Sequence, residues 1–407
     1  MTQTSPSSPS LLRLTGIPYF VIAFVARLPF AMMVVGVLTM VVSIRGSLSL
    51  GGLTSAAVGL GTALFGPLLG AAADRWGQRP VLLMCAALNA AMLAVFALVV
   101  YTPLTEAVVL ASAFMIGATA PQVSPMSRSR LVTIIAERMP QAQRARTTSA
   151  TMSYESAADE TVFVFGPFLV GILASFIAPW APIAIASALT LLFVGAFALH
   201  PTGRHVSVER DSDGRAPSGV SELFRPALLV VVVGIFGIGL FFGASLTALT
   251  SFMADRDAAE QAGLLYGVMG VGSAVLALGV AWLPPRFTLH ARWIVFAVVL
   301  VAGSLLFATA TSVTTMIVAL ALVGIGVGPT IVTQYSLGAA RSPLGRSATV
   351  MTMLGSGVVV GQALAAAVTG AIADGPGTSV ALLLPLVAAS IVLIAGIVNR
   401  TISPRQH

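Results

Sequence analysis

Residues 51–101 have the sequence GGLTSAAVGLGTALFGPLLGAAADRWGQRPVLLMCAALNAAMLAVFALVVY. Two apolar runs, 51–73 and 80–101, are separated here by only six residues, three of which are charged. Each run has about the 20 residues that an α-helix needs to cross roughly 30 Å of hydrocarbon. This stretch therefore predicts two membrane-spanning helices joined by a sharp turn at the membrane surface.

The same pattern continues along the whole chain of 407 residues, which is 57% hydrophobic and only 9% charged. No single water-facing core could hide that much apolar surface, so a soluble fold is excluded. Twelve apolar runs are long enough to span a bilayer: 17–43, 51–73, 80–101, 105–124, 147–176, 180–199, 227–253, 261–283, 292–311, 313–339, 346–373 and 377–398. The predicted fold class is an all-α integral membrane protein with twelve transmembrane helices in two pseudo-symmetric bundles of six.

The basic residues give the predicted topology. All 21 are arginines, which excludes chemistry that needs a lysine, such as a Schiff base. With the N-terminus in the cytoplasm, eighteen arginines fall in cytoplasmic segments, including Arg128 and Arg130 after the fourth helix. Arg45 and Arg256 fall outside, and Arg27 lies within the first helix. The net charge of +7 therefore indicates orientation in the membrane and not nucleic-acid binding. We expect both termini to be cytoplasmic and the protein to lie in the inner (plasma) membrane.

The longest polar stretch divides the helices into two sets. We predict an N-terminal six-helix bundle over 1–199, a cytoplasmic linker over 200–226 and a C-terminal six-helix bundle over 227–407. The single cysteine, Cys85, has no partner for a disulfide or a thiolate metal site. The four histidines lie in loops or at the end of the chain. We therefore expect no metal, no cofactor and no enzymatic activity.

The loop between the second and third helices carries the most specific motif of the chain. Gly70 allows close approach of another helix, Gly77 allows the turn, and Asp74 can pair with an arginine or with a facing helix N-terminus. This run resembles the cytoplasmic signature of the major facilitator superfamily, and the arrangement of six plus six helices resembles that family over essentially the whole chain.

The resemblance implies a transporter that works by alternating access, is monomeric and is driven by a proton gradient. It also implies a conformational latch, formed by Gly70, Asp74, Arg75, Gly77 and Arg79, that breaks when the transporter opens inward. Gln78 stands where the family often has a basic residue. The arginine-only, alanine- and glycine-rich composition fits a bacterial source with GC-rich DNA.

Three acidic residues, Glu155, Asp159 and Glu160, lie within the fifth predicted helix. Carboxylates at membrane depth are costly unless they face a cavity, pair with a cation or bind a proton, so we assign them as proton-coupling candidates. Glu155 and Asp159 share one helix face, whereas Glu160 is turned away by roughly 100°. The alternative for Glu155 is a position near the cytoplasmic end, with its side chain reaching the surface. Which acid faces the cavity is left open.

Arg27, in the first helix, is the fourth proton-coupling candidate. A guanidinium at membrane depth requires a carboxylate or an anionic ligand, and we expect Arg27 to pair with Asp159 or Glu160. The alternative is that Arg27 extends to one membrane surface. Drug exporters of the superfamily usually carry an arginine shortly before a glycine in the fourth helix, but the residues before Gly117 are uncharged.

The fifth helix continues with Gly166, Pro167 and Gly171. These residues are similar to the antiporter signature of drug-exporting members of the superfamily, which implies a tight, bent contact with a neighbouring helix. The match is partial because phenylalanine and valine occupy 163–165, where small residues are expected.

Candidate cavity residues complete the predicted site: Tyr154, Phe236, Gln334 and Gln362. Ordinary helix packing is the alternative for each of them. The leading function is secondary active transport, with proton-coupled efflux of a small amphipathic or hydrophobic compound. The alternative is uptake or facilitated diffusion of a small polar solute such as a sugar or organic acid. A polytopic membrane enzyme or a non-transporting membrane protein is the alternative of another class.

Overall fold

The computed structural model describes residues 10–204, 218–258, 261–284 and 286–402. Helices dominate these residues, and among them twelve segments are long and apolar enough to cross a membrane. The predicted linker over 200–226 is described only at its two ends, since 205–217 lie outside the described residues. The twelve predicted spans are confirmed, and most of their ends agree with the structure within three residues.

The helices up to residue 199 form the group that we call the N-terminal bundle. Its helices are α1 (Leu11–Thr15), α2 (Ile17–Val25), α3 (Leu28–Arg45), α4 (Leu48–Trp76), α5 (Gln78–Tyr101), α6 (Glu106–Ala118), α7 (Val123–Arg138), α8 (Gln141–Phe176), α9 (Ala181–Leu189) and α10 (Gly195–Leu199). A π-helical turn, Thr190–Val194, joins α9 to α10, so that these three segments form one span.

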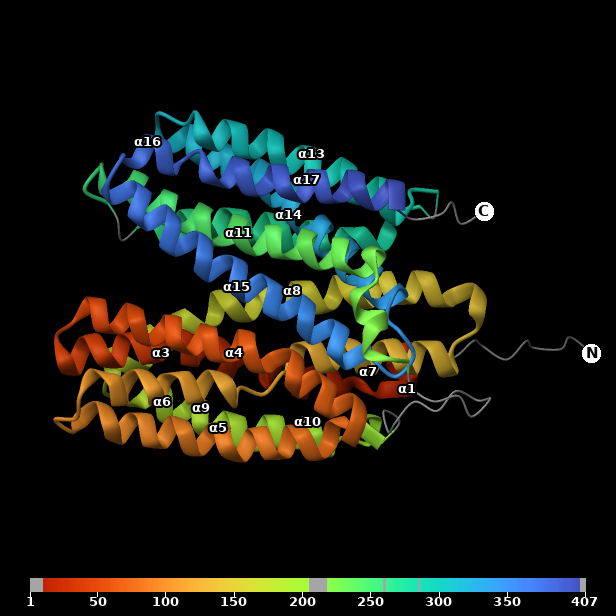
Figure 1. The fold of residues 1–407 in the computed structure, drawn as a ribbon, viewed down its shortest axis with the longest axis horizontal. Helices are drawn as coiled ribbons and strands as arrows, with labels where there is room; N and C mark the ends of the chain where they lie inside the picture. The colour runs from red at the N-terminus through yellow and green to blue at the C-terminus, as the bar shows by residue number, and fades with distance from the viewer. Residues whose placement is uncertain (1–9, 205–217, 259–260, 285, 403–407) are drawn as a thin grey trace, which may run out of the picture.

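The remaining helices form the C-terminal bundle. They are α11 (Pro226–Ala254), α12 (Ala262–Gly279), α13 (Leu289–Ala308), α14 (Val313–Ala340), α15 (Ser347–Asp374), α16 (Thr378–Ala381) and α17 (Leu384–Ile402). Figure 1 shows the two bundles one above the other, with α8 and α15 crossing between them and both chain termini at the same end. We call this end the terminal end and the opposite one the far end.

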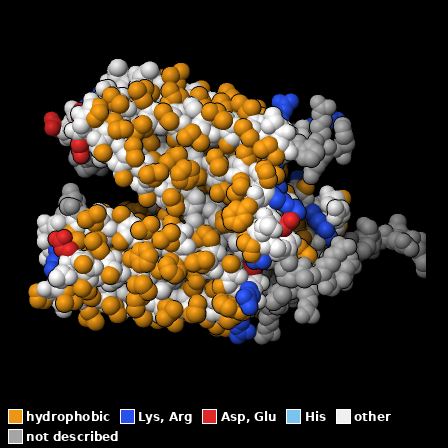
Figure 2. Space-filling view, in the orientation of Figure 1, with side chains coloured by type: hydrophobic (Ala, Val, Ile, Leu, Met, Phe, Trp, Pro, Cys, Tyr) orange, Lys and Arg blue, Asp and Glu red, His pale blue; other side chains and the backbone are white. Residues whose placement is uncertain are grey.

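The surface is apolar along the helices and charged at their ends. Figure 2 shows hydrophobic side chains over most of the visible face, whereas arginines and carboxylates gather at the two ends. The same view shows a cleft between the bundles that opens at the far end. At the terminal end α4 packs against α15 and closes the gap. The described conformation is therefore open at the far end only.

The fourth span is the main departure from the predicted helices. It was expected over 105–124, but it continues to Arg138 after an interruption at 119–122 between α6 and α7. Arg128 and Arg130 therefore lie in a helix and are buried, which makes their assignment to a cytoplasmic loop wrong. The hydropathy of the sequence predicted too early an end for this helix because α7 is polar. The polar side chains of α7 face neighbouring helices, which shield them from lipid.

Glycines bring α4 and α6 into backbone contact. A Cβ added at Gly117 would lie 1.9 Å from the carbonyl oxygen of Val58, and one at Gly61 would lie 2.3 Å from that of Phe114. Small residues are common at such contacts because lipid offers no hydrophobic drive, so that van der Waals packing must hold the helices together.

We expect Gly117→Ala to destabilise the protein by about 1–3 kcal/mol, the usual cost of overpacking. Thermal unfolding in detergent should show a lower melting temperature. Gly195→Ala is the matched control, since a Cβ there meets nothing within 4 Å and should leave the melting temperature unchanged or higher. Equal melting curves for the two variants would contradict the proposed backbone contact.

Candidate transport site

Arg27 lies at an interruption of the first span. The residue separates α2 from α3, and Pro29, which follows at the start of α3, cannot donate a backbone hydrogen bond to the preceding turn. The Arg27 side chain is 3% exposed and enters the interior of the N-terminal bundle. The alternative in which this guanidinium reaches a membrane surface is therefore wrong.

Two carboxylates of α8 hold Arg27. Its Nη2 donates to Glu155 Oε2, and its Nε lies 3.2 Å from Asp159 Oδ1. The predicted alternatives were Asp159 or Glu160; the structure has Glu155 and Asp159, the two acids that share a helix face. Glu155 is fully buried, so the alternative with this side chain at the membrane surface is also wrong.

Arg128 is the member of the site that sequence reasoning missed. Its Nη2 lies 2.7 Å from Asp159 Oδ2, and Ser124 Oγ donates to the same oxygen over 2.6 Å. The guanidinium also lies over the ring of Tyr335 in α14, 4.0 Å from the ring centroid. Pro121 and Pro125 are the sequence signals that could have indicated an interrupted helix instead of its end.

We call Arg27, Glu155, Asp159 and Arg128 the ionic network. It contains two guanidinium groups and two carboxylates, so its formal charges balance when both acids are ionised. Ser127 Oγ donates to Glu155 Oε1 over 3.0 Å and is itself 2.8 Å from the hydroxyl of Tyr19. Buried charges need such added hydrogen bonds, since Coulomb attraction alone barely repays their desolvation.

Glu160 does not belong to the ionic network. Its Oε1 accepts a hydrogen bond of 2.7 Å from Ser273 Oγ of α12, in the C-terminal bundle. The expected alternative pairing of Arg27 with Glu160 is wrong because Glu160, one residue after Asp159, is turned toward the other bundle. The three acids of α8 thus serve two separate contacts.

Asp74 binds the N-terminus of α15. Its carboxylate accepts from the backbone N–H of Ala348 over 2.9 Å and of Thr349 over 2.7 Å, and also from the Thr349 hydroxyl. Of the two partners that the sequence allowed, this is the facing helix N-terminus, whose free N–H groups favour an anion. Gly70 lies beside this contact, since a Cβ there would be 2.1 Å from Thr352 Oγ1.

The other residues of the predicted latch lie around this contact. Gly77 has φ +88°, a conformation that favours glycine, and forms the turn between α4 and α5. Arg75 and Arg79 are exposed. Gln78 is buried and accepts a hydrogen bond of 3.1 Å from Arg130 Nε. The opening of this latch during transport remains a prediction.

We expect Asp74→Asn to weaken the closed terminal end. A charge at a helix N-terminus is worth about 1–2 kcal/mol in a partly buried setting, so the ratio of closed to open terminal ends should fall roughly 5- to 30-fold. Spin labels at the exposed residues Gln141 and Arg286 would report the distance between the bundles by electron paramagnetic resonance. Cys85 is buried, so introduced cysteines can be labelled selectively. Asp255→Asn, at an exposed acid of the far end, should leave the distance unchanged.

Of the residues assigned to the bend of the fifth helix, Gly166 makes a close helix contact and Gly171 does not. A Cβ at Gly166 would lie 2.6 Å from the Cβ of Ala31, so α8 and α3 are in close contact there. Pro167 follows inside α8 without ending the helix. A Cβ at Gly171 would meet nothing within 4 Å. Gly171 therefore makes no tight helix contact, contrary to its assignment.

The four cavity candidates do not gather at one place. Gln334 is fully buried beside Gly234, within the C-terminal bundle, and neither polar atom of its amide has a hydrogen-bond partner among the described residues. Gln362 is exposed and Phe236 is half-buried. Tyr154 stands against the ring of Phe20, 5.2 Å between centroids, in the N-terminal bundle. The structure does not bring them into one shared cavity, and a role of each in binding substrate stays a prediction.

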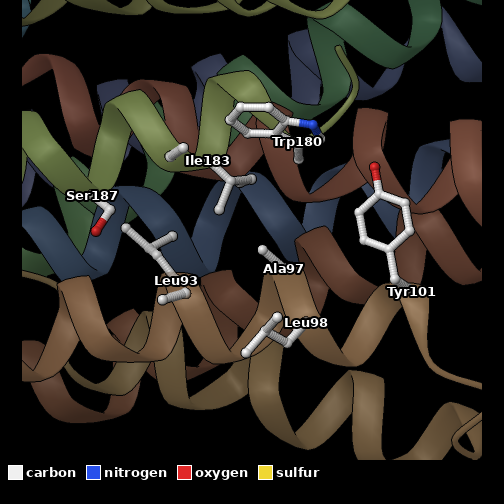
Figure 3. Close-up of a pocket in the computed structure, with 9 residues that line it drawn as sticks. Leu93, Ala97, Leu98, Tyr101, Trp180, Ile183 and Ser187 are labelled. Atoms are coloured by element: carbon white, nitrogen blue, oxygen red, sulfur yellow. The ribbon is translucent and has the colours of Figure 1, made fainter.

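A separate hollow lies between α5 and α9 (Figure 3). Its volume is about 470 Å³, and its lining is apolar except for Tyr101, Trp180 and Ser187. Ser187 donates its hydroxyl hydrogen to the backbone oxygen of Ala90, so it could only accept a hydrogen bond from a ligand. No side chain of the ionic network borders this hollow, which we interpret as a groove between helices of one bundle.

The geometry can be compared with known proteins. The family model of the Major Facilitator Superfamily matches residues 19–354, most of the chain. The chain belongs to this superfamily. Since its members are transporters, this superfamily protein is a transporter and not an enzyme. No curated protein sequence matches it.

Solved structures share the fold of this superfamily member at low sequence identity. The human organic anion transporter MFSD10 (TETRAN) is 19% identical with a TM-score of 0.73, and the match covers 96% of this chain and 100% of that one. A bacterial homologue of the iron transporter ferroportin, in an outward-facing state, is 15% identical with a TM-score of 0.75, covering 94% and 98%. The E. coli fucose:proton symporter FucP is 18% identical with a TM-score of 0.68, covering 96% and 100%. These likenesses show the fold alone.

Proposed function

We propose that this transporter exports a small amphipathic compound in exchange for protons. The observation that carries the proposal is the position of Asp159. This carboxylate is 21% exposed, whereas Arg27, Glu155 and Arg128 are at most 3% exposed. Of the ionic network, Asp159 is therefore the group that a proton or a substrate can reach.

A proton on Asp159 would change the network in a defined way. The neutral acid loses its ionic attraction to both arginines, but Arg27 keeps Glu155 as its partner. Arg128 keeps its hydrogen bond to Ser124 and the ring of Tyr335, which belongs to the other bundle. Proton binding thus acts on a contact between the two bundles, as coupling to alternating access requires.

Aromatic rings beside Asp159 support an amphipathic substrate. Phe163 lies one helical turn after Asp159 on the same face of α8 and is half exposed. Its ring stands edge-to-face with that of Phe30, 6.2 Å between centroids. A carboxylate near one exposed and one partly buried ring suits a compound with one polar or charged group and an apolar body.

The distribution of arginines supports the orientation of the proposal. With the terminal end in the cytoplasm, the cleft of Figure 2 faces outward, where protons enter under an inward gradient. We place the protein in the plasma membrane of a bacterium as a monomer that needs only its substrate, protons and lipid.

The test is substrate-driven proton movement in proteoliposomes, with cationic dyes, antibiotics and sugars as candidate substrates. We expect an exported compound to move protons in the opposite direction in the wild type. Asp159→Asn should abolish proton movement yet keep downhill movement of the substrate. Glu106→Gln, at an exposed acid of the far end, is the matched control and should behave like the wild type. Equal proton movement in wild type and Asp159→Asn would refute the assignment of Asp159.

Uptake of a small polar solute is the second candidate. The unpaired amide of the buried Gln334 favours it, since such a group can bind a solute hydroxyl. Movement of a sugar and protons in the same direction in the same assay would establish this function in place of export.

A further inference from the structure

The contact between Glu160 and Ser273 crosses from one bundle to the other inside the membrane-spanning region. Ser273 Oγ donates to Glu160 Oε1, whereas Glu160 Oε2 is buried and has no hydrogen-bond partner among the described residues. A carboxylate of this kind can accept several hydrogen bonds, so one leaves its charge poorly compensated. The ionised form is therefore costly here.

Ser273 is fixed to the C-terminal bundle. A Cβ at Gly328 of α14 would lie 2.1 Å from the carbonyl oxygen of Ser273, and one at Gly324 would lie 3.2 Å from its nitrogen. The backbones of α12 and α14 are thus in direct contact at this serine. Glu160 lies on α8, which contacts α3 closely at Gly166. The bond therefore joins two rigid parts that must separate if the bundles move.

Few other titratable groups act on Glu160. Asp159 precedes it on α8 and is held by Arg27 and Arg128. On α12, Tyr266 lies two turns before Ser273, on the same helix face, and within electrostatic range of Glu160. The single titratable side chain of α14 is Tyr335, whose ring lies over Arg128 instead. No described cation contacts Glu160.

We infer that Glu160 and Ser273 form a proton-sensitive tie between α8 and α12, which favours the conformation open at the far end when Glu160 carries a proton. The inference rests on the proposed proton-coupled transport. It assigns to Glu160 both the binding of a proton and a contact between the bundles, and it does not involve the ionic network. The neutral acid is tolerated in this buried contact. When α8 moves away from α12, water reaches the carboxylate and stabilises its charge, so the proton is released in the other conformation.

Linkage gives the sign of the pH effect. The conformation open at the far end binds the Glu160 proton more tightly, so its population must rise as the pH falls. One proton changes the ratio of the two conformations by at most about tenfold per pH unit. Spin labels at the exposed far-end residues Thr105 and Thr311 would report this ratio by electron paramagnetic resonance from pH 5 to pH 9.

Two variants separate the proton from the hydrogen bond. In the Asp159→Asn background, which removes the other proposed proton site, Glu160→Gln fixes a neutral side chain, so the far end should stay open and the ratio should change less than about twofold over the whole pH range. Ser273→Ala removes the one donor to the ionised acid among the described residues, so the midpoint of the pH effect should rise by about one unit. Glu106→Gln, which shares the far end with the labels, should keep the wild-type pH dependence.

The inference fails if Glu160→Gln keeps the wild-type pH dependence, or if Ser273→Ala leaves the midpoint unchanged in a folded protein. Failure of the proposed function is a different result. If the distance depends on pH through Glu160 but no candidate compound moves protons in proteoliposomes, the tie stands and proton-coupled export does not. If protons move with substrate while Glu160→Gln keeps the pH dependence, export stands and the tie does not.

Discussion

Arg27→Ala is expected to lose stability and transport together. Glu155 is fully buried and has Arg27 as its only ionic partner among the described residues, so the alanine variant leaves a carboxylate charge in the bundle interior. Removing one partner of a buried ion pair typically costs about 3–5 kcal/mol. The burial of Glu155 therefore makes Arg27 necessary for stability as well as for transport.

A double variant separates the two losses. Arg27→Gln combined with Glu155→Gln removes both charges and keeps groups that can hydrogen-bond to each other and to Ser127. We expect its melting temperature in detergent to return toward the wild-type value. Transport in proteoliposomes should remain at least about 100-fold below wild type, since Asp159 would have lost Arg27. An alanine variant with wild-type melting and transport would show that Arg27 and Glu155 are not coupled.

Arg128→Ala is expected to abolish transport by a different route. Arg128 joins Asp159 of the N-terminal bundle to Tyr335 of the C-terminal bundle. A desolvated cation–π contact is worth about 2 kcal/mol, and the charge-assisted hydrogen bond to Asp159 adds a similar amount. Together these terms, about 4 kcal/mol, correspond to a loss on the order of 1,000-fold. Initial transport rates in proteoliposomes, corrected for the amount of folded protein, are the measurement.

Substitutions of the partner ring test the stacking itself. Tyr335→Phe keeps the ring and should transport at close to the wild-type rate, whereas Tyr335→Leu should lose roughly 10- to 30-fold. Arg128→Lys keeps the charge but not the planar group, so it should recover stability more than transport. Equal rates for the phenylalanine and leucine variants would show that the ring contributes only volume.

The membrane fold was predictable because it depends on local composition. Apolar runs of about 20 residues and the distribution of arginines are properties of single segments, and they gave twelve spans that the structure confirms. The predicted end of the fourth span was wrong because that prediction also used local composition alone. The polar helix α7 is shielded by its neighbours, and a hydropathy average over one segment contains no information about neighbours.

The site was predictable only where helix periodicity was sufficient. The spacing of Glu155, Asp159 and Glu160 correctly separated two acids from the third. The pairing of cations with acids depends on how distant helices pack. Arg128 was therefore missed, and of the two expected partners of Arg27 only Asp159 was correct. The open space at Gly171 and the buried position of Gln334 likewise depend on packing that one sequence does not show.

The contact of Asp74 with α15 has a consequence for how this protein can vary. One side of the contact is a carboxylate, whereas the other consists largely of backbone N–H groups. Every amino acid except proline supplies such a group, so the two backbone hydrogen bonds depend on Asp74 and not on the residue types at 348 and 349, whereas the bond from the Thr349 hydroxyl does depend on a side chain. Paired changes between position 74 and the start of α15 are therefore not required among relatives. A saturation scan should find position 74 intolerant to most residues, and Thr349 tolerant of small substitutions but not of proline.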